Sequence, residues 1–262
     1  SNNMRHSFTL FNDTLRARCW DTGWILLVVL LVIPPLLMVV ITGVNEQLLN
    51  VLSDSTFWRA IQNSFLVAIF AALIALFAGL LILISSRCWR LNGLHFRADK
   101  LELIGTIILV TPGLVISTGV FLLLRNLTDI FDLAIVIVIA VNALMALPYV
   151  IKTLAQPMLH IAEQYDQLCA SLGMSGVSRF YLVEWKAIKQ PITHAFAISF
   201  VLSIGDLSAI ALFGSQDFRT LPLYLFQLLG SYQMQSAAVV SLFLLIFSVG
   251  VFALTEKLII KK

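Results

Sequence analysis

The sequence predicts an all-α membrane protein with six transmembrane helices. Hydrophobic residues make up 60% of the 262 residues and charged residues only 12%, about half the charged fraction of an ordinary soluble domain. A mean hydropathy of +0.95 implies more apolar surface than a soluble fold of this size could bury, so lipid must solvate much of the chain. Helices are expected because an open strand would leave unpaired backbone groups in lipid.

Six apolar segments are each near the roughly 20 residues that cross the hydrocarbon core, and together they form a domain over residues 24–262. In residues 1–23, Phe8, Phe11 and Leu15 recur at near-helical spacing beside arginines. This pattern predicts a cytoplasmic, interfacial helix that leads into the first span, and a frayed tail is the alternative. The expected spans are 24–44, 60–84, 101–124, 133–150, 192–213 and 236–260.

The distribution of lysine and arginine predicts the orientation of the spans. With the N-terminus in the cytoplasm, 14 of the 17 basic residues lie on the cytoplasmic side, and only Arg59, Arg125 and Arg219 lie outside. Cytoplasmic loops of membrane proteins carry such an excess of positive charge. Both termini of this multi-pass chain are therefore expected in the cytoplasm, and residues from about 151 to 191 form the longest cytoplasmic loop.

The first half of this loop has the pattern of a helix that ends at a glycine. Tyr165, Leu168, Cys169 and Leu172 are spaced at i, i+3, i+4 and i+7, which places them on one helical stripe. Gly173 follows at the position where a left-handed residue commonly ends a helix. We therefore expect a short helix that packs against the spans and stops at Gly173.

The second half of the loop has the pattern of another helix, which Ser175 can cap at its start and which ends before Pro191. Its apolar face carries Val177, Phe180, Tyr181 and Ile188. The small side chains of Cys169, Ala170 and Ser171 beside the turn would let a partner approach closely. The alternative is a loop that packs only on its own bundle.

No motif for catalysis or metal binding stands out in the sequence. It has no GxxxxGK[ST] phosphate-binding loop, and its three cysteines and four histidines are not spaced as metal ligands. We expect no catalytic residue, no metal, no cofactor and no nucleic-acid partner. An ion-driven secondary transporter or a membrane-embedded enzyme is an alternative, but such proteins place several ionisable groups inside their spans. Here Asp206 is essentially the one ionisable residue in the middle of a predicted span, with His194 near a span end.

The cytoplasmic loop resembles the EAA loop of ABC-importer permeases, whose pattern is Glu-Ala-Ala, three residues, Gly, nine residues and Ile-x-Leu-Pro. Gln167, Leu168 and Cys169 stand at the Glu-Ala-Ala places, Gly173 at the glycine and Val183 at the isoleucine. A tryptophan and a lysine replace the last Leu and Pro. Since glutamine replaces the glutamate, the resemblance implies no salt bridge at that place.

The resemblance extends to three further stretches. TPGLVISTGV (111–120) is similar to the third-span motif of the family, and LPYVIK (147–152) to the end of its fourth span. SIGDLSAIALFGSQDFRTLPLYLFQLLGSY (203–232) is similar to the second half of the fused permeases that carry thiamine. The resemblance implies the type I ABC-importer permease fold, with thiamine or its phosphates as substrate. Ferric iron, sulfate and molybdate are the alternatives.

The resemblance also implies partners. The short helix of the loop would be a coupling helix that docks on a cytoplasmic ABC ATPase dimer, whose closure rocks the spans between outward and inward openings. The chain itself would not be an enzyme. A periplasmic substrate-binding protein, the bilayer of the bacterial inner membrane and a second six-span half, fused in a longer chain, complete the expected assembly. The implied coupling residues are Gln167, Leu168, Cys169, Ala170, Ser171, Leu172, Gly173 and Val183.

Two places inside the spans are candidates for the translocation path. Asp206 is a carboxylate at bilayer depth, which costs about 2.5–3.5 kcal/mol on insertion scales. It would suit thiamine, whose thiazolium ring carries a fixed positive charge; a structural bond to a neighbouring helix is the alternative. The third span contains Pro112-Gly113, where unwound backbone can line a cavity or serve ordinary helix packing. Its polar neighbours Thr111, Ser117 and Thr118 are the other candidates.

The external loop over residues 214–235 is the expected contact for the binding protein. It holds Gln216, Asp217 and Arg219, together with Tyr232. A solvated loop without a partner is the alternative.

Overall fold

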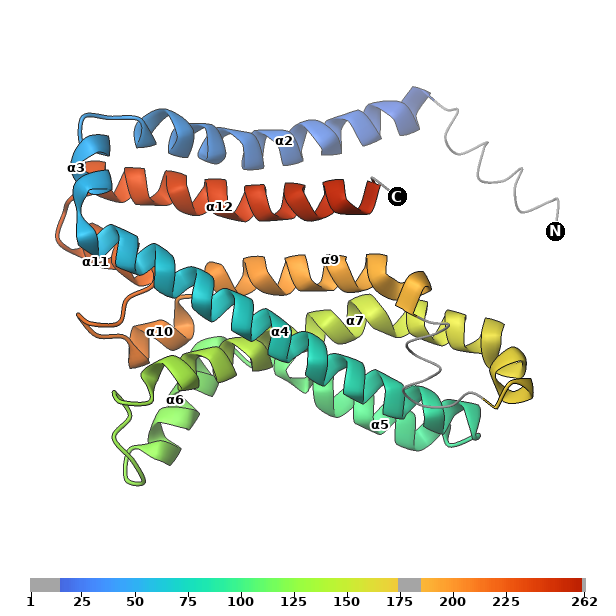
Figure 1. Cartoon of the computed structure of the whole chain (residues 1–262). Helices are drawn as coiled ribbons and strands as arrows, with labels where there is room; N and C mark the ends of the chain where they lie inside the picture. Colours follow the sequence, from blue (N-terminus) through green and yellow to red (C-terminus); the bar gives the residue numbers. More distant parts are fainter. Residues whose placement is uncertain (1–14, 174–184, 261–262) are drawn as a thin grey trace.

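The structure is a computed structural model that describes residues 15–173 and 185–260. All regular elements in these ranges are helices, which confirms the predicted all-α class. Figure 1 shows them in order. They are α2 (Leu15–Gly43), α3 (Leu48–Ser53), α4 (Ser55–Leu91), α5 (His95–Thr106), the 3-10 helix η1 (Ile107–Val110), α6 (Gly113–Leu124), α7 (Ala134–Ser171), α9 (Trp185–Ile204), α10 (Ser208–Phe213), α11 (Leu221–Gly230) and α12 (Met234–Ile260).

The helices supply the predicted number of membrane spans. Within the described residues, five helical segments are long and apolar enough to cross a bilayer. The bent pair formed by residues 95–110 and 113–124 brings the number to six if it is counted as one span. The first, second, fourth and sixth predicted spans correspond to α2, α4, α7 and α12. The fifth corresponds to α9 and α10 together, over 185–213.

The third span was predicted as one helix over 101–124 and is instead broken. The segment 95–110 and the helix α6 meet at an angle of 100°. Pro112 causes the break, because proline has no N–H to donate and forces the preceding residue out of the helical region. Thr111 accordingly has extended backbone angles, with φ −99° and ψ 123°. The carbonyl of Pro112 then accepts hydrogen bonds from the N–H groups of Val115 and Ile116, which starts α6.

The fourth span does not end at residue 150 as predicted. Helix α7 continues without interruption from Ala134 to Ser171 and passes through Pro148 and Pro157. The apolar stripe at 165–172 therefore belongs to the end of a long span helix, and the expectation of a separate short helix was wrong. Loss of hydropathy marks where a helix leaves the membrane, and it does not mark where the helix ends.

The external loop also contains more structure than predicted. Helix α11 occupies its middle, with Leu221, Tyr224 and Leu228 buried against α4 and α12. Pro222 lies in its first turn, where proline needs no hydrogen-bond partner. The Oγ atom of Ser64 on α4 accepts from the N–H of Leu221 at 2.7 Å, so this segment is anchored to the bundle.

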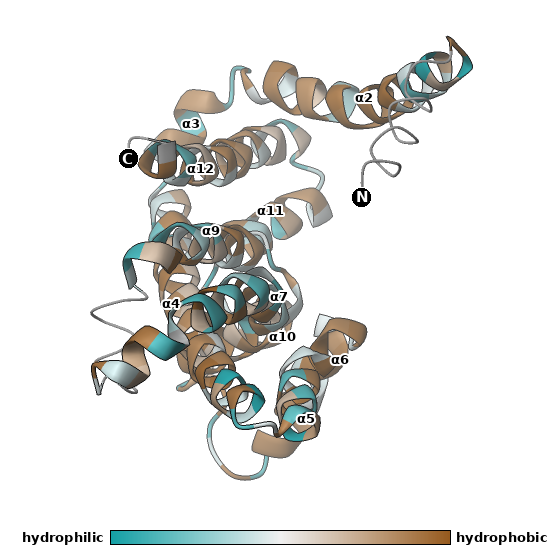
Figure 2. Cartoon of the chain, turned by 90° about the vertical axis from the view of Figure 1, so that its right-hand side faces the viewer, coloured by the Kyte–Doolittle hydropathy of each residue, from teal (hydrophilic) through white to brown (hydrophobic). Residues whose placement is uncertain are grey.

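The core lies between α4, α7 and α9. Small residues at the contact of these helices, such as Ala75, Ala143 and Ala195, allow close packing in the way that membrane bundles use widely. Helix α2 lies beside α12 at one edge, and the most apolar part of α2 has no buried residue, as expected for a lipid-facing helix. Figure 2 shows that the helix ribbons are coloured mostly as hydrophobic residues.

The helix ends fall into two groups. The start of α2 and the ends of α4, α7 and α12 lie at one end of the bundle, and α3 and α11 lie at the other (Figure 1). The first group carries Arg16 and Arg18 on α2, Arg87 and Arg90 on α4, and Lys257 on α12, whereas Arg219 lies just before α11 in the second group. The arrangement thus separates the charges in the way that the sequence predicts.

Candidate functional site

The breaks in the third and fifth spans lie against each other. A Cβ atom added to Gly113, the first residue of α6, would come within 2.7 Å of the Oγ atom of Ser208, the first residue of α10, and within 2.8 Å of the Sδ atom of Met145 on α7. Real Cβ atoms do not approach other atoms so closely. Glycine at this position therefore lets three helices converge at the two breaks.

Asp206 lies in the break between α9 and α10. Its carboxylate accepts hydrogen bonds from the Oγ atom of Ser208, at 2.9 and 3.1 Å, and from the N–H of Ala209, at 3.3 Å. The carboxylate thus satisfies one of the free N–H groups at the start of α10, as a capping residue does. The side chain is half-buried, so one carboxylate both holds the break and stays partly accessible.

A buried hydrogen bond joins α7 to the residue just before this break. The amide Nδ2 of Asn142 donates to the Oγ atom of Ser203 at 3.1 Å, and the carbonyl of Ser203 accepts from the N–H of Asp206 at 3.2 Å. On the other flank, the Ser208 hydroxyl lies 3.6 Å from the Sδ atom of Met145. Neither Asn142 nor Met145 was predicted from the sequence, although Asn142 is an amide within the apolar run AIVIVIAVNALMAL.

Among the described residues, the predicted path residues of the third span donate no hydrogen bond to the Asp206 carboxylate. Thr111 is half-buried between η1 and α6. Ser117 is fully buried, and its Oγ atom has no partner in the described part of the chain. Thr118 is exposed and donates to the carbonyl of Leu114 at 2.7 Å. The hydrogen-bond donors to the Asp206 carboxylate are instead Ser208 and Ala209, next to it in the chain.

The predicted coupling turn has the backbone conformation that its sequence suggests. Gly173 has φ +68°, a left-handed value that favours glycine, and its N–H donates to the carbonyl of Ala170 at 3.3 Å. Among the described residues, no atom lies within 4 Å of a Cβ added to Gly173. The left-handed backbone angle is therefore the observed reason for glycine at this position. The exposed residues of this end are Gln167, Leu168, Ala170, Ser171, Leu172 and Gly173.

Other expectations for this loop need correction. Cys169 is fully buried, so it does not offer a small exposed side chain to a partner. Leu168 and Leu172 are exposed and do not pack against the spans. The second helix was expected to end before Pro191, but α9 passes through this proline, and Ile188 is part of the central core. Residues 174–184, with Ser175, Val177, Phe180, Tyr181 and Val183, lie outside the described residues.

The external candidate residues lie on a loop that is fixed at both ends. Gln216 and Asp217 are exposed. Arg219 is half-buried, and its carbonyl accepts from Nδ2 of Asn63 at 2.9 Å. Nearby, the Tyr224 hydroxyl donates to Asp54 at 3.4 Å. Burial, and secondarily Asp54, raise the pKa of Tyr224, so its phenol stays protonated at neutral pH and can remain a donor.

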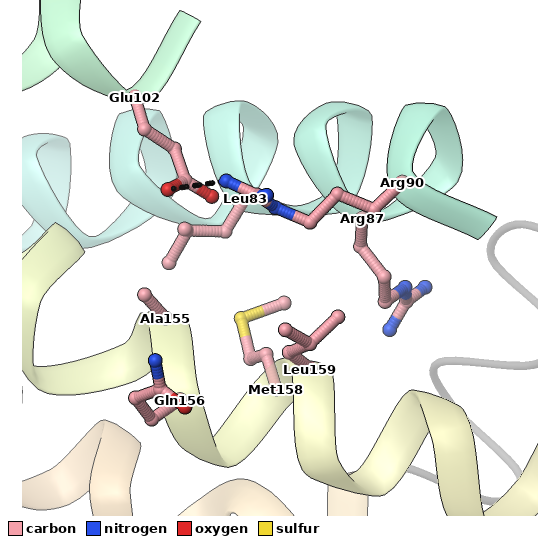
Figure 3. Close-up of a pocket in the computed structure, with 8 residues that line it drawn as sticks. All are labelled: Leu83, Arg87, Arg90, Glu102, Ala155, Gln156, Met158 and Leu159. Carbon is pink, nitrogen blue, oxygen red and sulfur yellow. Dashed lines mark hydrogen bonds and ion pairs between the residues drawn. The ribbon is translucent and has the colours of Figure 1, made fainter. Parts of the chain in front are cut away.

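A cavity of about 150 Å³ lies at the opposite, basic end, between α4, α5 and α7. Figure 3 shows the Arg90 guanidinium directed at Glu102, with Arg87 pointing away from it. Arg90 pairs with Glu102 at 3.1 Å and with Asp99 at 2.5 Å, and Glu102 also accepts from the hydroxyl of Ser86 at 2.5 Å. These contacts hold α5 against α4 at this end of the bundle.

Residues 96–259, more than half of the chain, match the family of binding-protein-dependent transport system inner membrane components. The chain belongs to this family. The match confirms the predicted family, and it removes the ion-driven transporter and the membrane-embedded enzyme as alternatives. The matched residues include both breaks, the turn at Gly173 and the external loop. Helices α2, α3 and α4 precede the matched residues.

Individual relatives extend the similarity to most of the chain. The thiamine transport system permease protein ThiP of Escherichia coli K12 is 44% identical over 247 residues, which cover 94% of this chain and 46% of that protein. The protein of the same description from Haemophilus influenzae is 41% identical over 87% of this chain and 43% of its own length. The Fe(3+)-transport system permease protein FbpB 2 of Haemophilus influenzae is 27% identical over 74% of this chain and 38% of its own length. The chain thus spans about half the length of these relatives.

Proposed function

We propose that the chain is a permease part of an ATP-driven importer that carries thiamine or thiamine phosphates across the bacterial inner membrane. The observation that carries this proposal is the 44% identity to a thiamine permease over 94% of the chain. Identity to the Fe(3+) permease is much lower, at 27%, so ferric iron is the weaker candidate, and sulfate and molybdate have no comparable support.

The geometry of the two breaks fits a cationic substrate. Discontinuous helices in transporters place free backbone groups and helix ends near the substrate at the middle of the membrane. Here α6 and α10 begin side by side, and the half-buried carboxylate of Asp206 supplies negative charge at that point. A fixed positive charge such as that of a thiazolium ring would be attracted to it. Asp206 is therefore the proposed path residue; Thr111, Ser117 and Thr118 are secondary candidates.

The same function requires three protein partners. We place a cytoplasmic ATPase dimer at the exposed residues that precede Gly173 and at Val183. We place a periplasmic substrate-binding protein at the external loop that carries Gln216, Asp217 and Arg219. A second six-span half would complete the pathway, and a fused arrangement is supported by relatives of about twice this length. Both termini would be cytoplasmic, since the basic side chains gather at that end.

The test uses the complete permease reconstituted in proteoliposomes with its ATPase and its binding protein. We expect the thiamine-loaded binding protein to stimulate ATP hydrolysis and the empty binding protein to stimulate it less. Binding proteins loaded with ferric iron or sulfate, taken from the corresponding systems, serve as controls and should have no effect. Stimulation by one of these controls, and not by thiamine, would overturn the substrate assignment.

A further inference from the structure

Helix α7 reaches from the proposed path to the proposed coupling turn without a break. Asn142 and Met145 lie near its beginning, and Ser171 is its last residue before the turn at Gly173. A displacement of the turn by a partner therefore acts on the same helix that contacts the break at Asp206. Such a movement can reach the break through the side chains of α7 that contact it.

The contacts of α7 hold the break on both flanks. Asn142 bonds the side chain of Ser203, just before the break, at 3.1 Å. Met145 lies 3.6 Å from the hydroxyl of Ser208, just after it. Asn142 and Met145 are three residues apart and so share one face of the helix. A movement of this face would act on both ends of the 204–207 segment through these two contacts.

The Asn142 amide is poorly explained by packing alone. The side chain is only 4% exposed, and its Oδ1 atom has no hydrogen-bond partner in ranges 15–173 and 185–260. A buried amide with an unmet acceptor destabilises a bundle relative to an apolar side chain of similar shape. Such a group in an apolar span calls for an explanation other than stability.

We propose that Asn142 is a positioning residue for transport, and that its hydrogen bond to Ser203 links movements of α7 to the position of Asp206. The inference rests on the proposed transport function, but it concerns the transmission of movement and not the choice of substrate. Asn142 acts through Ser203: the carbonyl of Ser203 accepts from the backbone N–H of Asp206, and the carboxylate of Asp206 then faces the path.

The chain supplies a matched control on α9. Ser199 lies one helical turn before Ser203, is also fully buried, and its Oγ atom has no partner among the described residues. Ser203→Ala removes the hydroxyl that bonds Asn142, whereas Ser199→Ala removes a buried hydroxyl without that bond. The two substitutions remove the same atom from the same helix.

The first experiment needs no substrate. A cysteine is placed at Leu207 in the complete transporter, with other reactive cysteines replaced by serine, and its rate of reaction with a water-soluble maleimide is measured. We expect the rate to differ between the nucleotide-free and the ATP-vanadate-trapped states in the parent and in Ser199→Ala. Ser203→Ala and Asn142→Leu should reduce this difference by about 2- to 13-fold, the range that corresponds to the net contribution of one hydrogen bond. Equal behaviour of Ser203→Ala and Ser199→Ala would overturn the proposal, as would a parent with no nucleotide-dependent difference.

The second experiment exchanges the partners. The double variant Asn142→Ser, Ser203→Asn keeps one amide and one hydroxyl at the same contact. It should recover most of the nucleotide-dependent difference in labelling rate that Asn142→Ser alone loses. Thermal unfolding of each variant is measured in parallel. If the nucleotide-dependent difference in labelling rate fell in proportion to thermal stability across all variants, the pair would be only structural and the proposal would be wrong. Failure of thiamine transport in the parent would instead count against the proposed function and leave the maleimide result to decide this inference.

Discussion

Gly113 and Ser208, the first residues of α6 and α10, lie so close together that a single added carbon at Gly113 would come within 2.7 Å of the Ser208 hydroxyl. Both residues begin the short second part of a broken span. The two breaks thus form one junction, which α7 closes from the side through Met145. Asp206 lies in this junction and supplies its carboxylate.

Gly113→Val should destabilise this junction. The added side chain has no room between Ser208 and Met145, and overpacking of this kind costs about 1–3 kcal/mol. Gly119→Val on the same helix is the control, because no atom lies within 4 Å of an added Cβ there. Thermal unfolding of the purified protein in detergent should show a lower Tm for Gly113→Val alone. Equal Tm values for the two variants would contradict the close approach.

Gly173→Val should separate membrane insertion from coupling. A β-branched residue at φ +68° strains the backbone by about 1–3 kcal/mol, so the turn at the end of α7 should change shape while the spans insert normally. We expect weaker copurification of the ATPase and less uptake. Gly173→Asn is the control, since asparagine tolerates left-handed angles. Parental uptake by a fully inserted Gly173→Val protein would refute a role for this turn.

Two substitutions distinguish the roles of Asp206. Asp206→Asn keeps an oxygen that can accept from Ser208 and Ala209, so stability should be nearly parental while uptake of a cationic substrate falls. Asp206→Leu removes these acceptors as well and should lower stability by about 0.5–2 kcal/mol, the cost of a lost cap. Uptake and thermal unfolding are measured on both, with Asp132→Asn in an exposed loop as the control. Parental uptake and stability in both Asp206 variants would exclude either role.

The orientation can be tested with two single cysteines at exposed sites. Ser171→Cys, at the end of α7, should react with a membrane-impermeant maleimide only from the cytoplasmic side. Gln216→Cys, in the external loop, should react only from the periplasm. The expectation follows from the separation of 14 basic residues from the other three. The reverse pattern of labelling would place the coupling turn outside the cell and rule out its proposed partner.

Hydropathy predicted the spans because membrane thickness sets the length of an apolar segment. It did not predict how helices break or continue. Pro112 indicated unwound backbone in the third span. The 100° bend, however, depends on the extended backbone of Thr111 and on the neighbours of Gly113. No proline marks the break at Asp206, where the carboxylate accepts a hydrogen bond from the backbone N–H of Ala209 at the start of α10.

The candidate site was predictable only in part. Gly173 was recognisable because a left-handed helix end depends on local sequence, and Asp206 because a charge in a span is rare. The burial of Cys169 and the bond between Asn142 and Ser203 depend on which helix faces which, and the second pair is 61 residues apart in the chain. Periodicity within one helix carries no information about such partners.

The proposed transport of thiamine can be measured directly as the uptake of radiolabelled thiamine into proteoliposomes that contain the complete permease and its ATPase, with the binding protein added on the external side. We expect accumulation that requires both ATP and the binding protein and that excess unlabelled thiamine suppresses. Asp206→Asn should reduce this accumulation although the protein is stable. Thiamine uptake that proceeds without ATP, or an assembled transporter that accumulates iron or sulfate but no thiamine, would contradict the proposed function.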